Sequence, residues 1–100
     1  MNHFDMPVFK GQIATAYEGR GQIYRKEKQD DKAEKQFRKA LECYQEALEL
    51  AKELKIPGML NTALVNRNIA NTYAWLGEFE EACQPAKNAY EIRKDRKSVV

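Results

Sequence analysis

The chain has 100 residues, the size of one small domain, and a chain this short buries only roughly 60–65% of its unfolded surface. Hydrophobic residues make up 43% and charged residues 32% of it, which favours a folded, soluble protein over a disordered or membrane-embedded one. The net charge of +2 is far from the one-sided basic surface that nucleic-acid binding requires.

A first helix is predicted from about Pro7 to Lys28, because proline suits the first turn of a helix and the following pattern is helical. The pattern has spacings of four, four, four and three, and its members are Phe9, Ile13, Tyr17, Gly21 and Tyr24.

A second helix is predicted from Asp31 to Leu54 and has the clearest periodicity in the chain. Its stripe consists of Ala33, Phe37, Ala40, Tyr44, Ala47, Ala51 and Leu54. Asp30 or Asp31 can cap the free amides at its start, and Pro57 and Gly58 end it.

Third and fourth helices follow, and short turns would pair the four helices as two antiparallel hairpins in an all-α fold. The third helix should end at Gly77, where a left-handed backbone is cheap, and the fourth begins near Phe79. Pro85 would remove a hydrogen bond inside the fourth helix, which predicts a kink there or a late start of that helix.

The chain repeats itself with a period of 49 residues: Gly21, Tyr24 and Ala33 match Ala70, Tyr73 and Ala82. A small residue lets the two helices of a hairpin approach closely, an aromatic ring fills the space beside them, and an alanine faces them from the second helix. Bulk at Gly21 or Ala33 should therefore be destructive.

This pattern resembles the tetratricopeptide repeat family, whose unit is a helical hairpin. The matching positions are Tyr17, Gly21, Tyr24, Ala33, Phe37, Ala70, Tyr73, Gly77 and Ala82. The resemblance implies one domain over 1–100, with repeats at about 7–56 and 58–95 that stack as a short right-handed superhelix and with frayed ends at 1–6 and 96–100. An unrelated four-helix bundle is the alternative.

The sequence departs from the family in its period and at two positions. The period is 49 residues where the family has 34, so the helices should be elongated. Arg20 and Asn66 stand where the family has large apolar groups, which puts close packing there in doubt.

The resemblance also implies a groove on the first and third helices that binds a peptide or a partner protein. Carried over by position, its residues are Glu18, Gln22, Arg25, Arg67, Asn68, Asn71 and Trp75. Arg67 and Asn71 resemble part of the family's carboxylate clamp, which is incomplete because Glu18 occupies the equivalent place in the first repeat. The alternative is that these residues are ordinary solvated side chains.

Nothing in the sequence predicts catalysis, a cofactor or a metal site. The single histidine, His3, lies near the chain end, and Cys43 and Cys83 fall on apolar sides of their helices with no CxxC pairing and no histidine nearby. Buried, reduced thiols are expected, and the protein is interpreted as no enzyme.

The chain contains no apolar run of the ~20 residues that a membrane span needs, and its first residues lack the features of a signal peptide. A cytoplasmic location without membrane insertion is expected. The basic residues Arg93, Lys94, Arg96 and Lys97 are explained by the negative end of a helix dipole.

Two repeats are fewer than the three that repeat arrays normally need, so something should cover the outer helix faces, including Phe9 and Ile13. A homo-oligomer, most simply a twofold dimer, or a different partner protein is expected. The alternative to a peptide-binding module is thus a structural unit whose main partner is a second copy.

Overall fold

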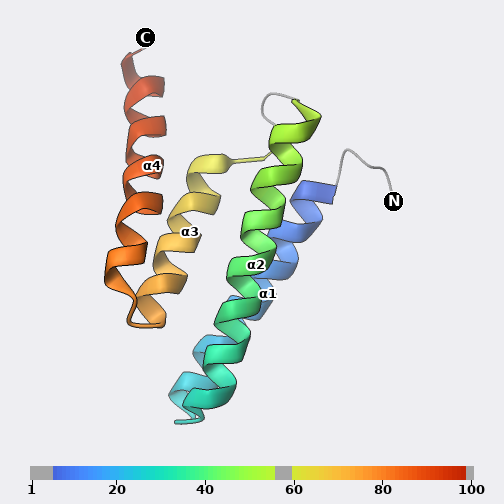
Figure 1. Ribbon diagram of the computed structural model, residues 1–100, viewed down its shortest axis with the longest axis vertical. Coiled ribbons are helices and arrows are strands. Elements are labelled where there is room, and N and C mark those ends of the chain that lie inside the picture. Colours follow the sequence, from blue (N-terminus) through green and yellow to red (C-terminus); the bar gives the residue numbers. More distant parts are fainter. Residues whose placement is uncertain (1–5, 56–59, 99–100) are drawn as a thin grey trace. The chain divides into compact units, whose positions relative to one another are not determined.

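The computed structural model describes residues 6–55 and 60–98, with side chains as far as Glu91, and these ranges contain four helices and no strand. The helices are α1 (Met6–Lys26), α2 (Asp30–Leu54), α3 (Thr62–Trp75) and α4 (Phe79–Ser98). They form two compact units, Met1–Leu60 and Asn61–Val100, in which α1 pairs with α2 and α3 with α4 (Figure 1). The predicted all-α fold of two antiparallel hairpins is confirmed, whereas their stacking as a superhelix stays a prediction.

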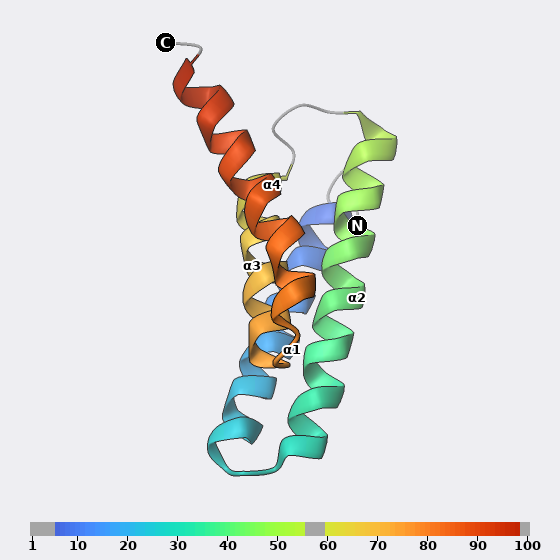
Figure 2. The same ribbon diagram turned by 60° about the vertical axis from the view of Figure 1, so that its left-hand side comes forward.

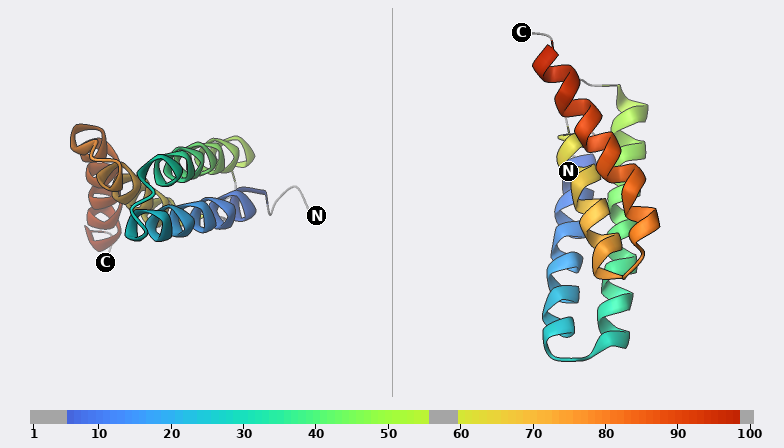
Figure 3. Two further views of the ribbon diagram at one scale, coloured as in Figure 1. Left: turned by 90° about the horizontal axis from the view of Figure 1, so that it is seen from below. Right: turned by 90° about the vertical axis from the view of Figure 1, so that its left-hand side faces the viewer.

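The core of the first hairpin lies between one face of α1 and one face of α2, which run side by side (Figures 2 and 3). The buried residues of α2 follow the predicted stripe as far as Ala47, and Ala51 and Leu54 at its end are only half-buried. The buried set is Ala33, Phe37, Ala40, Leu41, Tyr44 and Ala47. On α1 the buried residues are Pro7, Ala14 and Gly21, one in every seven. Because seven residues make almost two helical turns, α1 presents one narrow face to α2 along its length.

Gly21 is the point of closest approach in this hairpin. A Cβ atom added there would lie 2.6 Å from Cε1 of Phe37, a side chain with no exposed surface. Any side chain at this position therefore collides with a ring that has no room to move. This contact supports the prediction that bulk at Gly21 destabilises the hairpin.

The second hairpin has smaller side chains at the equivalent places. The positions 49 residues after Gly21 and Phe37 are Ala70 and Ala86, so the second hairpin has two alanines where the first has a glycine and a phenylalanine. Ala86 is exposed, and the buried residues of this unit are Ala63, Val65, Ile69, Ala70, Thr72 and Ala89. The core of the second hairpin is consequently the thinner of the two.

The two hairpin turns have the same backbone structure, again 49 residues apart. In the first, the amide of Lys28 donates to the Arg25 carbonyl and the amide of Gln29 to the Tyr24 carbonyl, at 3.1 and 2.9 Å. In the second, Gly77 donates to Ala74 and Glu78 to Tyr73, at 3.0 and 2.9 Å. Both pairs of bonds form a Schellman motif, whose central residue has a left-handed backbone. Gly77 has φ +77° as predicted, but in the first turn a lysine, Lys28, holds this conformation at φ 61°.

The helix starts differ from the expected capping. Gln29, not an aspartate, precedes α2 and makes no side-chain cap, because the helix begins at Asp30 and both Asp30 and Asp31 fall inside its first turn. In the first turn their negative charges still interact favourably with the positive end of the helix dipole. At α3 a cap that the sequence analysis missed is present: Asn61 Oδ1 accepts from the amide of Leu64 at 3.0 Å.

The helix α4 begins at Phe79 and contains Pro85 in its interior, so the predicted late start is wrong and a kink at Pro85 stays a prediction. Of the ends predicted to be frayed, Met6 lies in α1 and residues 96–98 lie in α4, while 1–5 and 99–100 are outside the described residues.

Candidate protein-binding face

One face of α3 carries exposed polar and apolar side chains together. Arg67 and Asn71, one helical turn apart, are exposed, and they stand between two large apolar side chains, Leu64 at 43% and Trp75 at 39% exposure. The opposite face supplies the hairpin core through Ala63, Val65, Ile69 and Ala70. The helix therefore separates a packing face from a solvent face.

The electrostatics of this face are simple, since Arg67 is the only charged residue of α3. Asn68 is half-buried, and its carbonyl accepts from the buried Thr72 hydroxyl at 2.7 Å. Asn71 and Arg67 thus form a short polar strip with one positive charge and no acid on the same helix.

The residues expected on α1 have a different setting. Glu18, Gln22 and Arg25 are all half-buried. Glu18 accepts a 2.8 Å hydrogen bond from the buried Tyr44 hydroxyl of α2 and a 3.3 Å bond from Gln22 Nε2. Thr15 Oγ1 lies 3.1 Å from the same hydroxyl, so this network joins the two helices of the first hairpin.

Arg25 also contacts its own hairpin. Its guanidinium carbon lies 5.8 Å from the centre of the Phe37 ring, and its Nε lies 3.6 Å from a carboxylate oxygen of Asp30. The seven predicted partner-binding residues therefore fall into two groups. On α3, Arg67, Asn71 and Trp75 are exposed and Asn68 is half-buried, whereas the three residues on α1 take part in hairpin packing. Their role in binding stays a prediction.

Cations from α2 also cover the aromatic signature residues of α1. Lys39 Nζ lies 5.6 Å from the centre of the Tyr17 ring, and Lys32 Nζ lies 5.8 Å from that of Tyr24. Such contacts are favourable because the face of an aromatic ring is electron-rich, and the lysine stems shield the half-buried rings from water. Tyr24 and Tyr73, at equivalent places in the repeat, are both half-buried as the packing scheme requires.

The two cysteines have unlike surroundings. Cys43 is half-buried, and burial, with the nearby Glu46 carboxylate, raises the pKa of its thiol. The same carboxylate lies 2.5 Å from Lys10 Nζ, and this hydrogen bond raises the pKa of Lys10. Cys83 is exposed, so its predicted burial is wrong: in the described part of α4 only Ala89 is buried, and the apolar stripe around Cys83 is not covered.

A raised pKa keeps the Cys43 thiol protonated at neutral pH, which opposes a role as nucleophile. No group of three or more potential metal ligands occurs among the residues that the structure describes, and His3 lies outside them. In the same part of the chain, no helix combines the length and the apolar character needed to cross a membrane.

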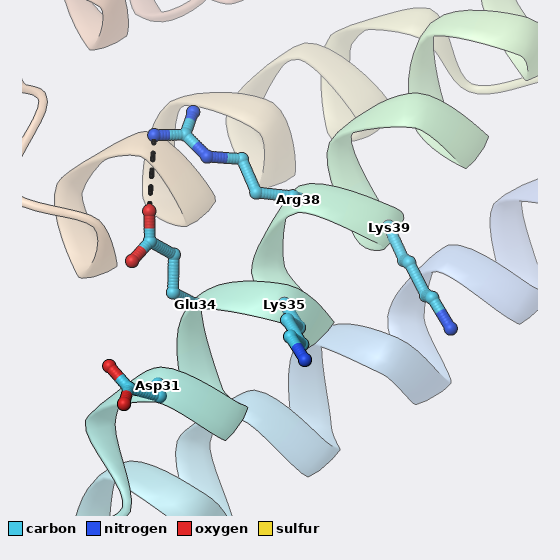
Figure 4. A pocket seen from close by; sticks show the side chains of 5 residues that line it. All are labelled: Asp31, Glu34, Lys35, Arg38 and Lys39. Atoms are coloured by element: carbon cyan, nitrogen blue, oxygen red, sulfur yellow. Dashed lines mark ion pairs between the residues drawn. The ribbon is translucent and has the colours of Figure 1, made fainter.

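A shallow recess on α2 is lined by charged side chains alone, namely Asp31, Glu34, Lys35, Arg38 and Lys39 (Figure 4). Glu34 and Arg38, one turn apart, form an ion pair at 3.8 Å. Both partners are about half exposed, so the pair contributes at most a few tenths of a kcal/mol. This recess has the properties of a solvated helix face.

Leu64 also belongs to the α3 face, although it was not predicted there. The spacing of the residues could have predicted it. Leu64, Asn68, Asn71 and Trp75 follow spacings of four, three and four, on a different side of the helix from the buried stripe. The arrangement on α3 can hold another chain through amide hydrogen bonds, one positive charge and apolar contact.

Two family models described as tetratricopeptide repeat match the sequence, one over residues 35–95 and the other over residues 14–42. The first alone covers more than half of the chain, and together they extend from residue 14 in α1 to residue 95 in α4. The chain belongs to the tetratricopeptide repeat family. No curated protein and no solved structure matches it. Repeats of this family generally mediate protein–protein interaction.

Proposed function

We propose that this protein is a non-catalytic interaction module that binds a peptide or a partner protein on the exposed face of α3. The observation that carries the proposal is the exposure of Arg67 and Asn71 between Leu64 and Trp75. None of the four is among the buried residues of its hairpin. Because these four side chains do not contribute to the hairpin core, packing does not determine which of them are polar and which are apolar. Partner binding explains this choice of residues better than stability does.

The chemistry of the face suggests the kind of segment that it binds. An asparagine amide both donates to and accepts from a peptide backbone, and arginine holds a carboxylate with two parallel bonds. Because α3 carries no acid, the positive charge of Arg67 has no compensation on its own helix. The proposed ligand therefore carries a carboxylate beside an apolar side chain that contacts Trp75 or Leu64.

Glu18, Gln22 and Arg25 belong to the proposal as supporting residues. The resemblance assigns them to partner binding, and their contacts with Tyr44, Phe37 and each other support a role in holding α1 in place. We propose that they affect binding less than the α3 residues do. A cytoplasmic location is part of the same proposal.

The test is selection of ligands from a displayed library of 12-residue peptides, followed by fluorescence anisotropy with the enriched peptide. Replacing Arg67 and Asn71 by alanine should weaken binding about tenfold or more, because a bidentate charged contact and an amide contact are both lost. The matched control replaces Lys87 and Asn88, also a cation and an amide exposed on a helix, and should leave affinity unchanged. Equal affinities for the two double variants would refute the α3 face as the binding surface.

We also propose self-association as a second role, most simply as a twofold dimer. Exposed apolar side chains support it: Phe9 and Ile13 on α1, and Phe79 and Tyr90 on α4, are all exposed. A monomer mass by light scattering at tens of micromolar would exclude this second role and leave peptide binding untouched.

A further inference from the structure

The side of α1 that points away from α2 carries an apolar stripe. Phe9, Ile13 and Ile23 are 39%, 48% and 58% exposed, and Ala16 and Arg20 between them are exposed as well. These five residues, the outer face of α1, follow spacings of four, three, four and three. They stand about half a turn from Pro7, Ala14 and Gly21, the residues that face α2. The stripe is therefore no part of the hairpin core.

The middle of the outer face is hollowed. A recess there is lined by Ile13, Ala16, Tyr17 and Arg20, which are residues i, i+3, i+4 and i+7 of one helix. Four residues at these spacings form the hole into which a side chain of a facing helix inserts when two helices pack. The small side chain of Ala16 permits the close approach that such packing needs.

We infer that the outer face of α1 pairs with the same face of a second copy, with the two helices antiparallel about a twofold axis at Ala16. The inference rests on the proposed self-association and specifies its interface. In this register Ala16 meets Ala16 of the second copy, and Phe9 lies opposite Ile23, because each stands seven residues from the axis. The stripe is thus complementary to itself, as an interface with twofold symmetry requires.

The charges on α1 select the antiparallel arrangement. A parallel pair would bring Arg20 beside Arg20 of the second copy. In the antiparallel register the two Arg20 residues lie on opposite sides of the axis, roughly 12 Å apart along the helices. Like charges close together are unfavourable, so the parallel alternative is opposed.

The size of the contact sets its strength. A helix of 21 residues is about 31 Å long, so one pair of such helices forms an interface at the low end of the range for specific complexes. We therefore expect a dimer that dissociates on dilution.

Disulfide trapping tests this geometry. In a variant with Cys43 and Cys83 replaced by alanine, Ala16→Cys should form a cross-linked dimer under mild oxidation, since a disulfide needs Cα atoms roughly 4.4–6.8 Å apart. Ile23→Cys is the matched control: it lies on the same face, but in the antiparallel register its two copies stand far apart. Ala16→Cys alone should cross-link, and circular dichroism checks that both variants are helical.

Each other outcome overturns the inference. Efficient cross-linking at Ile23→Cys indicates a parallel pair. If light scattering shows a dimer but Ala16→Cys does not cross-link, the protein self-associates through another surface and the α1 interface is refuted. If light scattering shows a monomer, both self-association and the α1 interface are refuted. A second test uses the protein with both natural cysteines and measures the dimer dissociation constant. Ile13→Glu should raise this constant about tenfold or more, because it buries an unpaired charge in the interface. Gln45→Glu, at an exposed position of α2, should leave it unchanged. Equal dissociation constants for these two variants contradict the proposed interface.

Discussion

Gly19 and Gly21 lie two residues apart in the middle of α1, yet their surroundings are opposite. No atom lies within 4 Å of a Cβ added at Gly19, whereas the same atom at Gly21 falls under 3.0 Å from three atoms of the Phe37 ring. A glycine inside a helix costs about 1 kcal/mol relative to alanine, so its presence at Gly21 needs a reason, which the ring of Phe37 provides.

The two positions should respond to alanine with opposite signs. Gly21→Ala gains about 1 kcal/mol of helix propensity but overpacks the core at about 1–3 kcal/mol, so we expect a net loss of up to about 2 kcal/mol. Gly19→Ala meets no neighbour and should stabilise by about 0.5–1 kcal/mol. Urea denaturation measures both, and a loss or a gain at both positions would show that Phe37 does not determine the choice of residue.

Lys28 is strained where its repeat equivalent, Gly77, is not. A left-handed backbone costs an L-residue with a side chain about 1–2 kcal/mol, part of which the greater freedom of glycine in the unfolded chain offsets. Lys28→Gly should therefore raise the free energy of unfolding by about 0.5–1 kcal/mol, and Gly77→Ala should lower it by a similar amount. Thermal and urea unfolding check this pair, and a destabilised Lys28→Gly variant would contradict the account of the turn.

At the scale of the element, the network around Tyr44 ties α1 to α2. The Tyr44 hydroxyl donates to Glu18 at 2.8 Å and lies 3.1 Å from Thr15 Oγ1, in a side chain that is 1% exposed. Removing the hydroxyl leaves the Glu18 carboxylate with fewer donors in a half-buried place.

Tyr44→Phe should therefore destabilise the first hairpin by about 1–2 kcal/mol, somewhat less than a fully buried charged hydrogen bond because Glu18 keeps Gln22 and some access to water. Tyr90→Phe removes the same atom from a side chain that is 63% exposed and should change stability by under about 0.5 kcal/mol. Equal effects of the two substitutions in chemical denaturation would show that the Tyr44 network contributes nothing.

The elements were predictable because their signals are local. The stripe of α2 and the left-handed Gly77 follow from spacing and from glycine chemistry, and both are confirmed. The cap of α2 was not predictable in the same way, since one residue of difference in the helix start moves Asp30 from the cap into the first turn. The left-handed backbone of Lys28 was not predictable from its residue type either, because the geometry of the turn imposes it.

The candidate site was only partly predictable. The family resemblance assigned Arg67, Asn71 and Trp75 to one face of α3, where the structure has them exposed. Glu18 looked equivalent to Arg67 in the repeat, but it is bonded to Tyr44 on another helix. A hydrogen bond between residues 26 apart in sequence depends on how two helices pair, and a single-helix pattern carries no information about it.

At the scale of the whole molecule, the two hairpins differ in their cores and in their exposed faces. The first buries Phe37 and Tyr44 and joins its helices by a polar network, whereas the second packs mainly through small side chains. The face with exposed mixed chemistry belongs to the second hairpin, on α3. A thinner core with a chemically distinctive surface fits the proposal that the second hairpin binds the partner.

The most direct test of this proposal is to follow the backbone amide signals of the natural protein by nuclear magnetic resonance while the selected peptide is added. We predict shifts concentrated on α3 between Leu64 and Trp75, with smaller changes near Glu18 and none in the charged recess of α2. Shifts confined to α2 or α4, with α3 unchanged at saturation, would contradict the assignment of the binding face.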